Sequence, residues 1–240
     1  AIMPLIDCFY QGPIKYYINS HEQNCGHAAT GYAKSSNRTG VCVVTRGPGL
    51  TNLVTPILDA NNDSTPLVVF SGQVPLKAMG TCAFQEAPST EITKSITKWS
   101  YCVQDVNELP YVVDKAFWLA NHKKSGAVHI DLPKCVLTSE LNDNYKEFSY
   151  KEEKKEFNYD FNQIVDIINN SNQPVLYVGK GALEASSELR DFAINANIPV
   201  TTTMHGMGVF DENHELSLEM LGMHGNYAAN HAIQNSDCII

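Results

Sequence analysis

The sequence predicts an α/β fold in which two domains, each with a parallel sheet, follow one another along the chain. Short runs that are apolar throughout alternate with helix-length segments, which is typical of parallel strands covered by helices on both faces. The 240 residues suffice for one large domain or two ordinary ones. A strongly polar stretch, residues 137–158, interrupts the alternation, which resumes after it.

The first domain is expected over residues 1–136, which hold four short apolar runs. The strands predicted from these runs are Tyr16–Ile18, Val41–Val44, Pro66–Phe70 and Ala127–Asp131. The helices predicted between them are Gly26–Ala33, made of small residues, and Thr51–Ala60. Residues 80–86 show little regular pattern, and long irregular segments of this kind often carry function.

Residues 137–158 are interpreted as a solvated linker, because charged and amide side chains dominate them. The second domain is expected over residues 159–240 and begins with an amphipathic helix that includes Phe161, Ile164 and Ile168. The elements predicted after it are a strand at Pro174–Val178, a helix around Leu189–Ala196 and a strand at Ile198–Thr202.

Both ends of the sequence suggest a piece of a longer protein. The first residues, Ala1-Ile2-Met3, carry no initiator methionine. Residues 237–240 read as the opening of a buried strand, which would leave an unpaired edge if it stopped there. We therefore expect the second domain to be incomplete.

The composition excludes several classes of protein. A net charge of −9 argues against nucleic acid or an anionic membrane as the main partner. No apolar run approaches the ~20 residues that a membrane helix needs. The seven cysteines are odd in number and scattered, so we expect neither a disulfide framework nor a zinc site, and favour a reducing compartment.

Three polar segments are expected at the carboxyl ends of strands, where open α/β sheets bind their ligands. The first, residues 21–23, places Glu22 at a helix N-terminus, a position that is usually ordinary dipole chemistry. The second, residues 47–52, is a Gly-Pro-Gly turn that lets a ligand approach the backbone closely. The third runs from Ser71 to Glu86. Each segment alone is weak evidence, because a packed structural turn would look the same.

Taken in this order, the segments resemble the acetolactate synthase catalytic subunits, a family of thiamine-diphosphate-dependent enzymes. The matching motifs are His-Glu-Gln at 21–23, Gly-Pro-Gly-Leu-Thr-Asn at 47–52, Gly-Gln-Val-Pro at 72–75, Gly-Thr-Cys-Ala-Phe-Gln-Glu at 80–86, Ile-Asp-Leu-Pro-Lys at 130–134 and Leu-Gly-Met-His-Gly at 221–225. The resemblance covers nearly the whole chain except the linker. Pyruvate decarboxylase and pyruvate oxidase share the fold and the Glu but lack the segment from Gln-Val-Pro to Phe-Gln-Glu.

The resemblance implies a pyrimidine-binding domain for thiamine diphosphate over residues 1–136. Glu22 would be the cofactor-activating carboxylate, with a pKa raised by an apolar, water-poor site. Phe84 and Gln85 would lie beside the cofactor and the incoming ketoacid and complete the catalytic residues. The other residues implied are Gly47, Pro48 and Asn52 at the cofactor and Pro75 and Ala83 at the mouth of the substrate channel.

For residues 159–240 the resemblance implies an incomplete, Rossmann-like FAD-binding domain. Gly179 and Gly181 follow a predicted strand and would let the flavin nucleotide approach closely. The other flavin contacts implied are Thr203, Met204, Leu221, Gly222, Met223 and His224. On its own, Gly-x-Gly is weak evidence for a nucleotide site.

No metal ligand is expected in this chain. In the family, a third domain with a Gly-Asp-Gly motif binds Mg²⁺ and the diphosphate, and the sequence contains no match to it. The resemblance further implies pyruvate and 2-ketobutyrate as substrates and a homodimer or higher oligomer of the complete chain, and it allows for a regulatory subunit. The 240 residues alone are expected to be inactive.

Some residues depart from the family pattern: Asn24, Cys25, Thr30, Arg46, Cys82 and Lys180. Arg46 stands beside the Gly-Pro-Gly turn, and we expect its side chain to point outward, because burying a guanidinium without a partner is costly.

Two alternatives stay open. The chain could belong to another thiamine-diphosphate carboligase or decarboxylase, such as glyoxylate carboligase, although that enzyme lacks the activating Glu. It could instead be a non-catalytic remnant that binds FAD or a partner subunit. The compartment implied is the mitochondrion for a fungal source, and otherwise the cytoplasm or a plastid.

Overall fold

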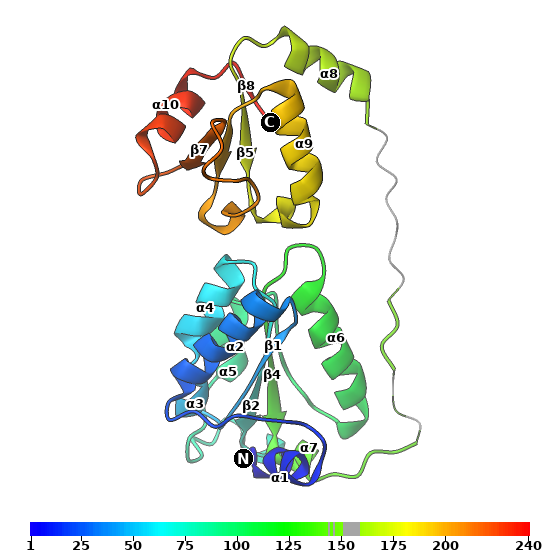
Figure 1. Cartoon of the computed structure of the whole chain (residues 1–240). Helices are drawn as coiled ribbons and strands as arrows, with labels where there is room; N and C mark the ends of the chain where they lie inside the picture. Colours follow the sequence, from blue (N-terminus) through cyan, green and yellow to red (C-terminus); the bar gives the residue numbers. More distant parts are fainter. Residues whose placement is uncertain (144, 146, 151–158) are drawn as a thin grey trace. The chain divides into compact units, whose positions relative to one another are not determined.

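The computed structural model describes residues 1–143, 145, 147–150 and 159–240 (Figure 1). The chain divides into two compact units, unit 1 over residues 1–152 and unit 2 over residues 153–240. Each unit holds one all-parallel sheet, which confirms the predicted α/β class. The finer boundaries expected at residues 136 and 158 stay predictions.

The sheet of unit 1 has the strand order β1-β2-β4-β3. Its strands are β1 (Gly40–Val44), β2 (Leu67–Gln73), β3 (Trp99–Cys102) and β4 (Ala127–Pro133). Strands β2 and β4 are buried along their whole length. Their sequences are apolar on both faces because helices cover both faces of the sheet.

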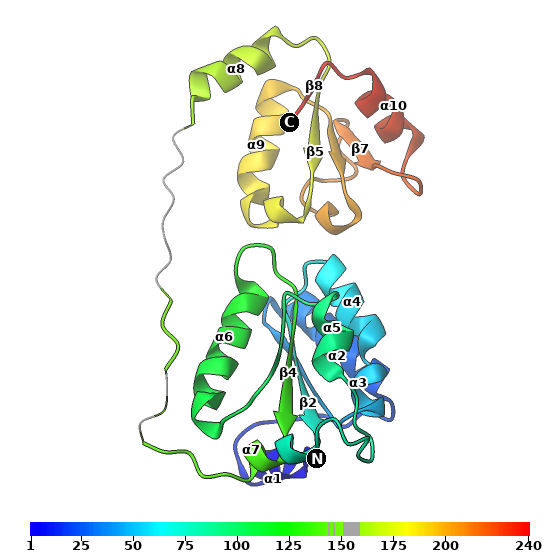
Figure 2. The same ribbon diagram turned by 180° about the vertical axis from the view of Figure 1, so that it is seen from behind.

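Helices lie on the two faces of this sheet (Figures 1 and 2). The helices of unit 1 are α1 (Met3–Gln11), α2 (Glu22–Ser36), α3 (Pro48–Thr51), α4 (Val54–Asn62), α5 (Ser89–Lys94), α6 (Leu109–Asn121) and α7 (Lys134–Leu137), with 3₁₀ turns η1 (Leu76–Ala78) and η2 (Val106–Glu108). One core cluster joins α2 and α4 to the sheet through residues such as Ala29 and Ile57. A second cluster joins α6 to the opposite face through Val112, Ala116 and Ala120.

The strand predicted at Tyr16–Ile18 is wrong, because these residues form no regular structure. Tyr17 and Ile18 are 87% and 89% exposed, and Tyr16 lies near Phe9 of α1 and pairs with no strand. The helix predicted at Thr51–Ala60 is divided into α3 and α4, with Asn52 between them. Helices α1 and α6 and strand β3 were not predicted from the sequence.

The sheet of unit 2 has the strand order β7-β6-β5-β8. Its strands are β5 (Pro174–Val178), β6 (Val200–Thr202), β7 (Ser217–Met220) and β8 (Cys238–Ile239). Its helices are α8 (Phe161–Asn170), α9 (Ser186–Ala196) and α10 (Tyr227–Asn235). Two 3₁₀ turns, η3 (Lys180–Ala185) and η4 (Met204–Gly206), follow β5 and β6. The core includes Leu176, Val178 and Phe210. Residues 237–240, which were expected to open a strand, contain β8 at the edge of this sheet, where Ile239 is 55% exposed.

The segment expected to be a solvated linker is partly packed. Phe148 and Tyr150 lie against Trp118 of α6, with ring centroids 5.6 Å and 4.0 Å away. The packing of these two aromatic residues was not predicted, because the segment around them is mostly polar. The rest of the expected linker includes residues 144, 146 and 151–158, which lie outside the described residues.

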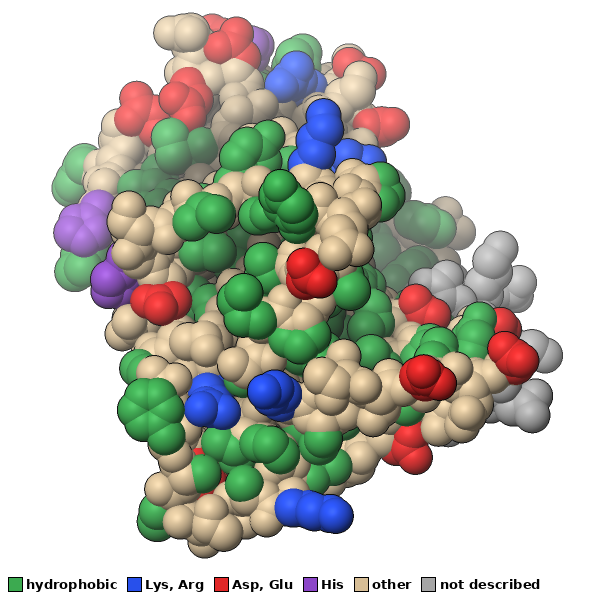
Figure 3. All heavy atoms as spheres, turned by 90° about the horizontal axis from the view of Figure 1, so that it is seen from below, with side chains coloured by type: hydrophobic (Ala, Val, Ile, Leu, Met, Phe, Trp, Pro, Cys, Tyr) green, Lys and Arg blue, Asp and Glu red, His purple; other side chains and the backbone are tan. Residues whose placement is uncertain are grey.

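Unit 1 leaves several large apolar side chains in water, including Met3, Tyr10 and Phe84. Apolar side chains also gather in patches on the face drawn in Figure 3. In the part of the chain that the structure describes, no helix is long and apolar enough to cross a membrane.

Candidate functional site

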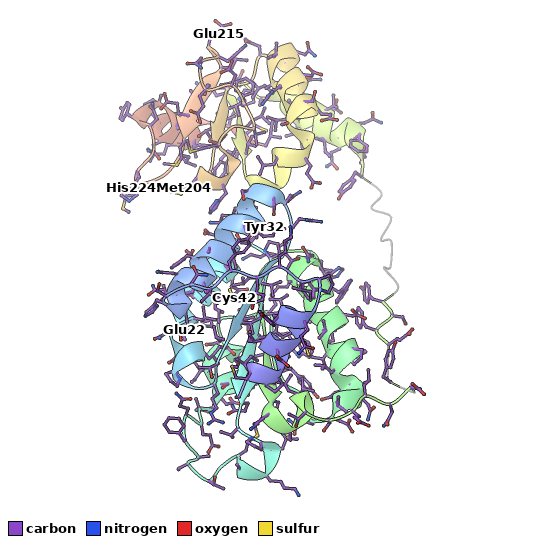
Figure 4. The ribbon with its side chains drawn as sticks, turned by 60° about the horizontal axis from the view of Figure 1, so that its bottom comes forward. Glu22, Tyr32, Cys42, Met204, Glu215 and His224 are labelled. Carbon is purple, nitrogen blue, oxygen red and sulfur yellow. The ribbon has the colours of Figure 1, made fainter. Side chains whose placement is uncertain are left out.

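Glu22 and Asn52 meet at the start of α2. His21 caps this helix, since its Nδ1 accepts the backbone N–H of Gln23 over 3.1 Å. Glu22 is therefore the first helical residue, with its carboxylate at the positive end of the helix (Figure 4). The Asn52 side chain, which follows α3, donates to Glu22 Oε2 over 2.9 Å. Two residues predicted for one site are thus in contact.

The pKa of Glu22 is lowered, chiefly by the hydrogen bond from Asn52 and then by a backbone N–H. Burial acts in the opposite direction and is outweighed. The raised pKa expected from the sequence is therefore wrong for this chain, because a donor faces the carboxylate and water still reaches it. Glu22 is held ionised, as an oriented hydrogen-bond acceptor.

Gly47 brings the Gly-Pro-Gly turn against Gln85. Its φ is +58°, and a Cβ at this position would lie 2.4 Å from the Gln85 carbonyl oxygen. A side chain here would be strained by both the dihedral and the contact. The turn and Gln85, which the resemblance assigns to the same cofactor, are therefore adjacent, and Gln85 also has a positive φ of +58°.

Arg46 does not point freely outward as expected. Its guanidinium carbon lies 5.9 Å from the centroid of the Phe84 ring, and its Nε is buried without a hydrogen-bond partner. The exposed Phe84 ring gives the cation a surface to lie on, which compensates part of the burial. Among the described residues, no hydrogen bond joins Arg46 to Glu22.

The loop that carries Ala83, Phe84 and Gln85 is held by Glu86. The Glu86 carboxylate accepts the backbone N–H of Gly80 over 2.5 Å and that of Ala83 over 3.0 Å. These bonds lower the pKa of Glu86. The motif at residues 80–86 contains Glu86, but its sequence does not indicate this role. Pro75, the other predicted channel residue, precedes η1 at the start of the same connection.

A buried polar network that the sequence analysis missed lies beneath this loop. Ser71 Oγ lies 2.6 Å from Asp131 Oδ1 and 2.7 Å from His129 Nε2. Gln73 Nε2 donates to Asp131 Oδ2 over 2.8 Å and to the Ala87 carbonyl over 3.1 Å. The network therefore ties the ends of β2 and β4 to the loop. Its signal in the sequence was a His and an Asp inside an otherwise apolar strand.

Compared with water, the protein environment favours the neutral forms of the two titratable groups in this network, His129 and Asp131. Burial lowers the pKa of His129 to about 3. Burial raises the pKa of Asp131 to about 6, against the hydrogen bonds from Ser71, Gln73 and Ser89. With neutral His129 donating from Nε2 to Ser71, the Ser71 hydroxyl donates to Asp131, so each group has a partner.

In unit 2, the residues predicted to contact flavin gather at the carboxyl ends of three neighbouring strands. The Thr203 N–H donates to the Val178 carbonyl over 2.9 Å, and the Leu221 N–H donates to the Thr202 carbonyl over 3.0 Å. The loops after β5, β6 and β7 therefore leave the sheet together. Figure 4 shows Met204 and His224 on one side of unit 2, with Glu215 at the opposite end.

The glycines of these loops face open space. A Cβ added at Gly179, Gly181 or Gly222 would meet nothing within 4 Å. Gly222 also has a φ of +121°, and its loop is closed by Asn230, which bonds both the N–H and the carbonyl of Gly222. Met223 and His224 project from this loop into water. A nucleotide could therefore approach the backbone here without displacing a side chain.

Within the ranges that the structure describes, no group of three or more His, Cys, Asp or Glu side chains is placed to hold a metal ion.

Two parallel-sheet units with polar loops at the carboxyl ends of their strands define a ligand-binding α/β protein. Residues 1–93 match the family described as the N-terminal TPP binding domain of thiamine pyrophosphate enzymes. Residues 161–240 match the central domain of the same enzymes. The chain therefore belongs to the thiamine pyrophosphate enzymes and carries these two domains.

Within this class, the chain is similar to acetolactate synthases. It is 42% identical to the mitochondrial acetolactate synthase catalytic subunit of Saccharomyces cerevisiae, covering 100% of this chain and 37% of that protein. It is also 42% identical to the acetolactate synthase large subunit of Corynebacterium glutamicum, with 100% and 40% covered. Identity to the chloroplastic acetolactate synthase of Arabidopsis thaliana is 42%, with 95% and 35% covered. The chain thus spans well under half the length of these relatives.

Proposed function

We propose that the chain belongs to an acetolactate synthase that joins pyruvate to a second 2-ketoacid, pyruvate or 2-ketobutyrate, with loss of CO₂. The proposal is carried by the Glu22–Asn52 pair at the start of α2, in a domain of the thiamine-binding family. The similarity to acetolactate synthases supports the choice of reaction within the class.

Thiamine diphosphate, when bound, supplies an electron sink for the decarboxylation. The residues of unit 1 fit its aminopyrimidine ring. The Glu22 carboxylate is ionised and oriented by Asn52, so it can accept a hydrogen bond from a ring nitrogen and hold a proton there. The buried Arg46 Nε is an unsatisfied donor next to the Gly47 turn, so this region has a polar atom that a ligand could satisfy.

The loop of residues 80–86 is proposed to form the wall of the site that faces the substrate. Phe84 is 78% exposed, and an apolar ring left in water beside Arg46 is suited to cover a bound ligand. Glu86 keeps the loop in shape, and Gln73 anchors its far end through the Ala87 carbonyl. Pro75 and Ala83 would then border the path by which the ketoacid enters.

FAD is proposed to bind unit 2 at the loops after β5, β6 and β7. The open space at Gly179, Gly181 and Gly222 supports this site, and Thr203, Met204, Leu221, Met223 and His224 are the side chains proposed to contact the flavin nucleotide. Mg²⁺ is proposed to be held by residues outside this chain.

For assembly we propose a homodimer or higher oligomer of the complete protein, to which a regulatory subunit can bind. The protein is proposed to be mitochondrial in a fungus and cytoplasmic or plastid elsewhere. The printed names of the yeast and plant relatives, mitochondrial and chloroplastic, support this choice.

The function is tested by supplying the full-length protein with pyruvate, thiamine diphosphate, Mg²⁺ and FAD and assaying acetolactate as acetoin. We expect turnover that requires thiamine diphosphate. A protein that consumes pyruvate but releases only acetaldehyde would instead indicate a decarboxylase. A folded protein that consumes no pyruvate but binds FAD would favour the non-catalytic alternative.

A further inference from the structure

Two cysteines outside the proposed chemistry, Cys25 and Cys42, lie together between α2 and β1. Cys25 is half-buried, one turn into α2 and three residues after Glu22, whereas Cys42 is buried in the middle of β1 (Figure 4). The Cys42 thiol donates to the Cys25 carbonyl oxygen over 3.4 Å. Both side chains belong to the same apolar cluster.

The two backbones approach closely along this stretch. A Cβ at Gly40 of β1 would lie 2.4 Å from the carbonyl oxygen of Ala29 in α2. Four helical residues from Ala29 to Cys25 advance about 6 Å, and two strand residues from Gly40 to Cys42 advance about 6.6 Å. The hydrogen bond from Cys42 to Cys25 shows that both steps run the same way. The two cysteines therefore face each other across the contact between α2 and β1, with the Cys42 sulfur in reach of the Cys25 backbone. A disulfide between them requires Cα atoms about 4.4–6.8 Å apart.

The local environment makes Cys25 the reactive partner. The Cys42 thiol lowers the pKa of Cys25 to about 7, and the Val43 backbone N–H assists, against the opposing effects of burial and the Glu22 charge. Hydrogen bonding to Cys25, and then burial, raise the pKa of Cys42. Because the thiolate is the nucleophilic form, Cys25 is expected to react first, with Cys42 held beside it as a thiol.

We propose that Cys25 and Cys42 form an oxidisable dithiol, whose disulfide bridges α2 to β1 when the protein meets a hydroperoxide. The Cys25 thiolate attacks one peroxide oxygen, the O–O bond breaks, and hydroxide leaves, which gives a sulfenic acid. The Cys42 sulfur then attacks the Cys25 sulfur, the S–O bond breaks, and the Cys42 proton leaves with the hydroxyl group as water. The two thiols lose two electrons, and hydrogen peroxide is reduced to two waters.

The bridge would join two elements that carry the proposed thiamine site. Helix α2 begins with Glu22, and β1 leads into the turn at Gly47. A disulfide holds its sulfurs about 2.05 Å apart, closer than two thiols in contact. Oxidation therefore shifts Glu22 relative to that turn, which makes the dithiol a reversible control of the site. This consequence rests on the proposed function, whereas the formation of the disulfide does not.

The chain contains its own reference thiols. All seven cysteines are free, and Cys8 and Cys82 are exposed. Exposure favours reaction with peroxide. The lowered pKa of Cys25, however, increases the fraction of its reactive thiolate at neutral pH. Two results therefore distinguish the dithiol from Cys8 and Cys82: Cys25 reacts faster with peroxide, and the product is a disulfide with Cys42.

The test oxidises the full chain with a graded series of hydrogen peroxide, blocks remaining thiols with iodoacetamide, and maps unreduced peptides by mass spectrometry. We expect a cross-linked pair of peptides containing Cys25 and Cys42, lighter by two hydrogens, and removed by dithiothreitol. Cys25 should be consumed about tenfold faster than Cys82.

Two variants separate the steps. Cys42→Ser, which keeps a hydrogen-bond donor beside Cys25 but cannot form the disulfide, should stop at a Cys25 sulfenic acid that dimedone traps. Cys8→Ala, the matched control, should leave the cross-link unchanged. The proposal is overturned if no cross-link between Cys25 and Cys42 has formed when half of Cys82 is oxidised, a result that needs no variant to fold. Loss of thiamine diphosphate binding would not affect the cross-link, so the dithiol and the proposed function fail separately.

Discussion

The contact between Glu22 and Asn52 is the part of the proposed site in which single residues matter most. The two residues are thirty positions apart in the sequence, and they meet because α2 begins where α3 ends. The sequence placed both at the thiamine site through the family resemblance. It predicted the wrong direction for the pKa of Glu22, because the motif does not show that the Asn52 amide donates to the carboxylate.

Replacing Asn52 with Ala should raise the pKa of Glu22, because the hydrogen bond from Asn52 is the largest cause of its depression. A depressed folded-state pKa contributes stability above the ordinary pKa of a carboxyl group, and this stability is lost as pH falls through the folded value. The pKa is measured by ¹³C NMR of labelled Glu side chains. Asn24→Ala, on the exposed side of α2, is the control and should leave the titration of Glu22 unchanged.

Arg46 carries a buried Nε with no partner, and an unmade hydrogen bond of this kind costs about 1–3 kcal/mol. Contact with Phe84 returns only about 0.5–1 kcal/mol. Arg46→Met keeps the stem and removes the donor, so it should raise the free energy of unfolding of unit 1 by about 1 kcal/mol. Urea unfolding followed by tryptophan fluorescence reports on unit 1, because Trp99 and Trp118 are the two tryptophans of the chain. Arg38→Met, an exposed control, should change little, and a clear loss of stability for Arg46→Met would show that the guanidinium is productively bound.

At the level of elements, the turn between β1 and α3 positions the site. Gly47→Ala combines a φ of +58° with a Cβ only 2.4 Å from the Gln85 carbonyl oxygen. We expect a loss of stability of about 2 kcal/mol or more and a displaced Gln85. Gly31→Ala is the matched control, because a Cβ there meets nothing within 4 Å, and Ala favours the helix by about 1 kcal/mol. Equal stability changes at both positions, measured by urea unfolding, would contradict this role of Gly47.

In the network that joins β2 and β4, Asp131 and His129 should have opposite effects on the pH dependence of stability. Asp131 has a folded-state pKa of about 6, above its ordinary value, so its contribution falls as pH rises from about 4 to 6. His129, at about 3, lies below its ordinary value, so its contribution falls as pH drops through the same interval. In the unchanged chain the two trends oppose each other.

The pH dependence that each group causes can be measured in a variant that lacks the other group. Asp131→Asn should make stability rise more steeply with pH between about 4 and 6, by roughly 3 kcal/mol over that interval. His129→Gln should make it fall with pH. Urea unfolding at several pH values gives both slopes through the same tryptophan signal. Parallel pH profiles for the two variants would show that these groups do not titrate as their burial requires.

The elements also show what sequence patterns can predict. Apolar runs located β1, β2, β4, β5 and β6, because buried parallel strands are apolar on both faces. The same rule produced the wrong strand at Tyr16–Ile18, since a run of three apolar residues does not show whether a neighbouring strand is available. Strand β3, which is only partly buried, was missed for the opposite reason.

Over the whole molecule, the prediction of two α/β domains was correct, because the polar stretch between the two alternating patterns marks a real change of unit. The residues proposed for the two sites are divided between the units: Glu22, Asn52, Gly47 and Gln85 lie in unit 1, and the glycines at 179, 181 and 222 lie in unit 2. The family motifs located these residues. Gln73 and Asp131, which hold the end of the loop, became visible only when the strands were assembled, because they are 58 positions apart in the sequence. The partners of Glu86 lie within its own loop, but the sequence does not show that the carboxylate turns back to their backbone N–H groups.

The central claim is that Glu22 activates thiamine diphosphate. It is tested most directly by measuring, with NMR, the exchange of the C2 proton of thiamine diphosphate on the full-length protein with Mg²⁺ present. Glu22→Gln should slow this exchange by at least about a hundredfold, because assistance by the carboxylate is lost while the shape is kept. Glu91→Gln, on the exposed surface of α5, should leave the rate unchanged. Exchange at the unchanged rate in Glu22→Gln would contradict the account.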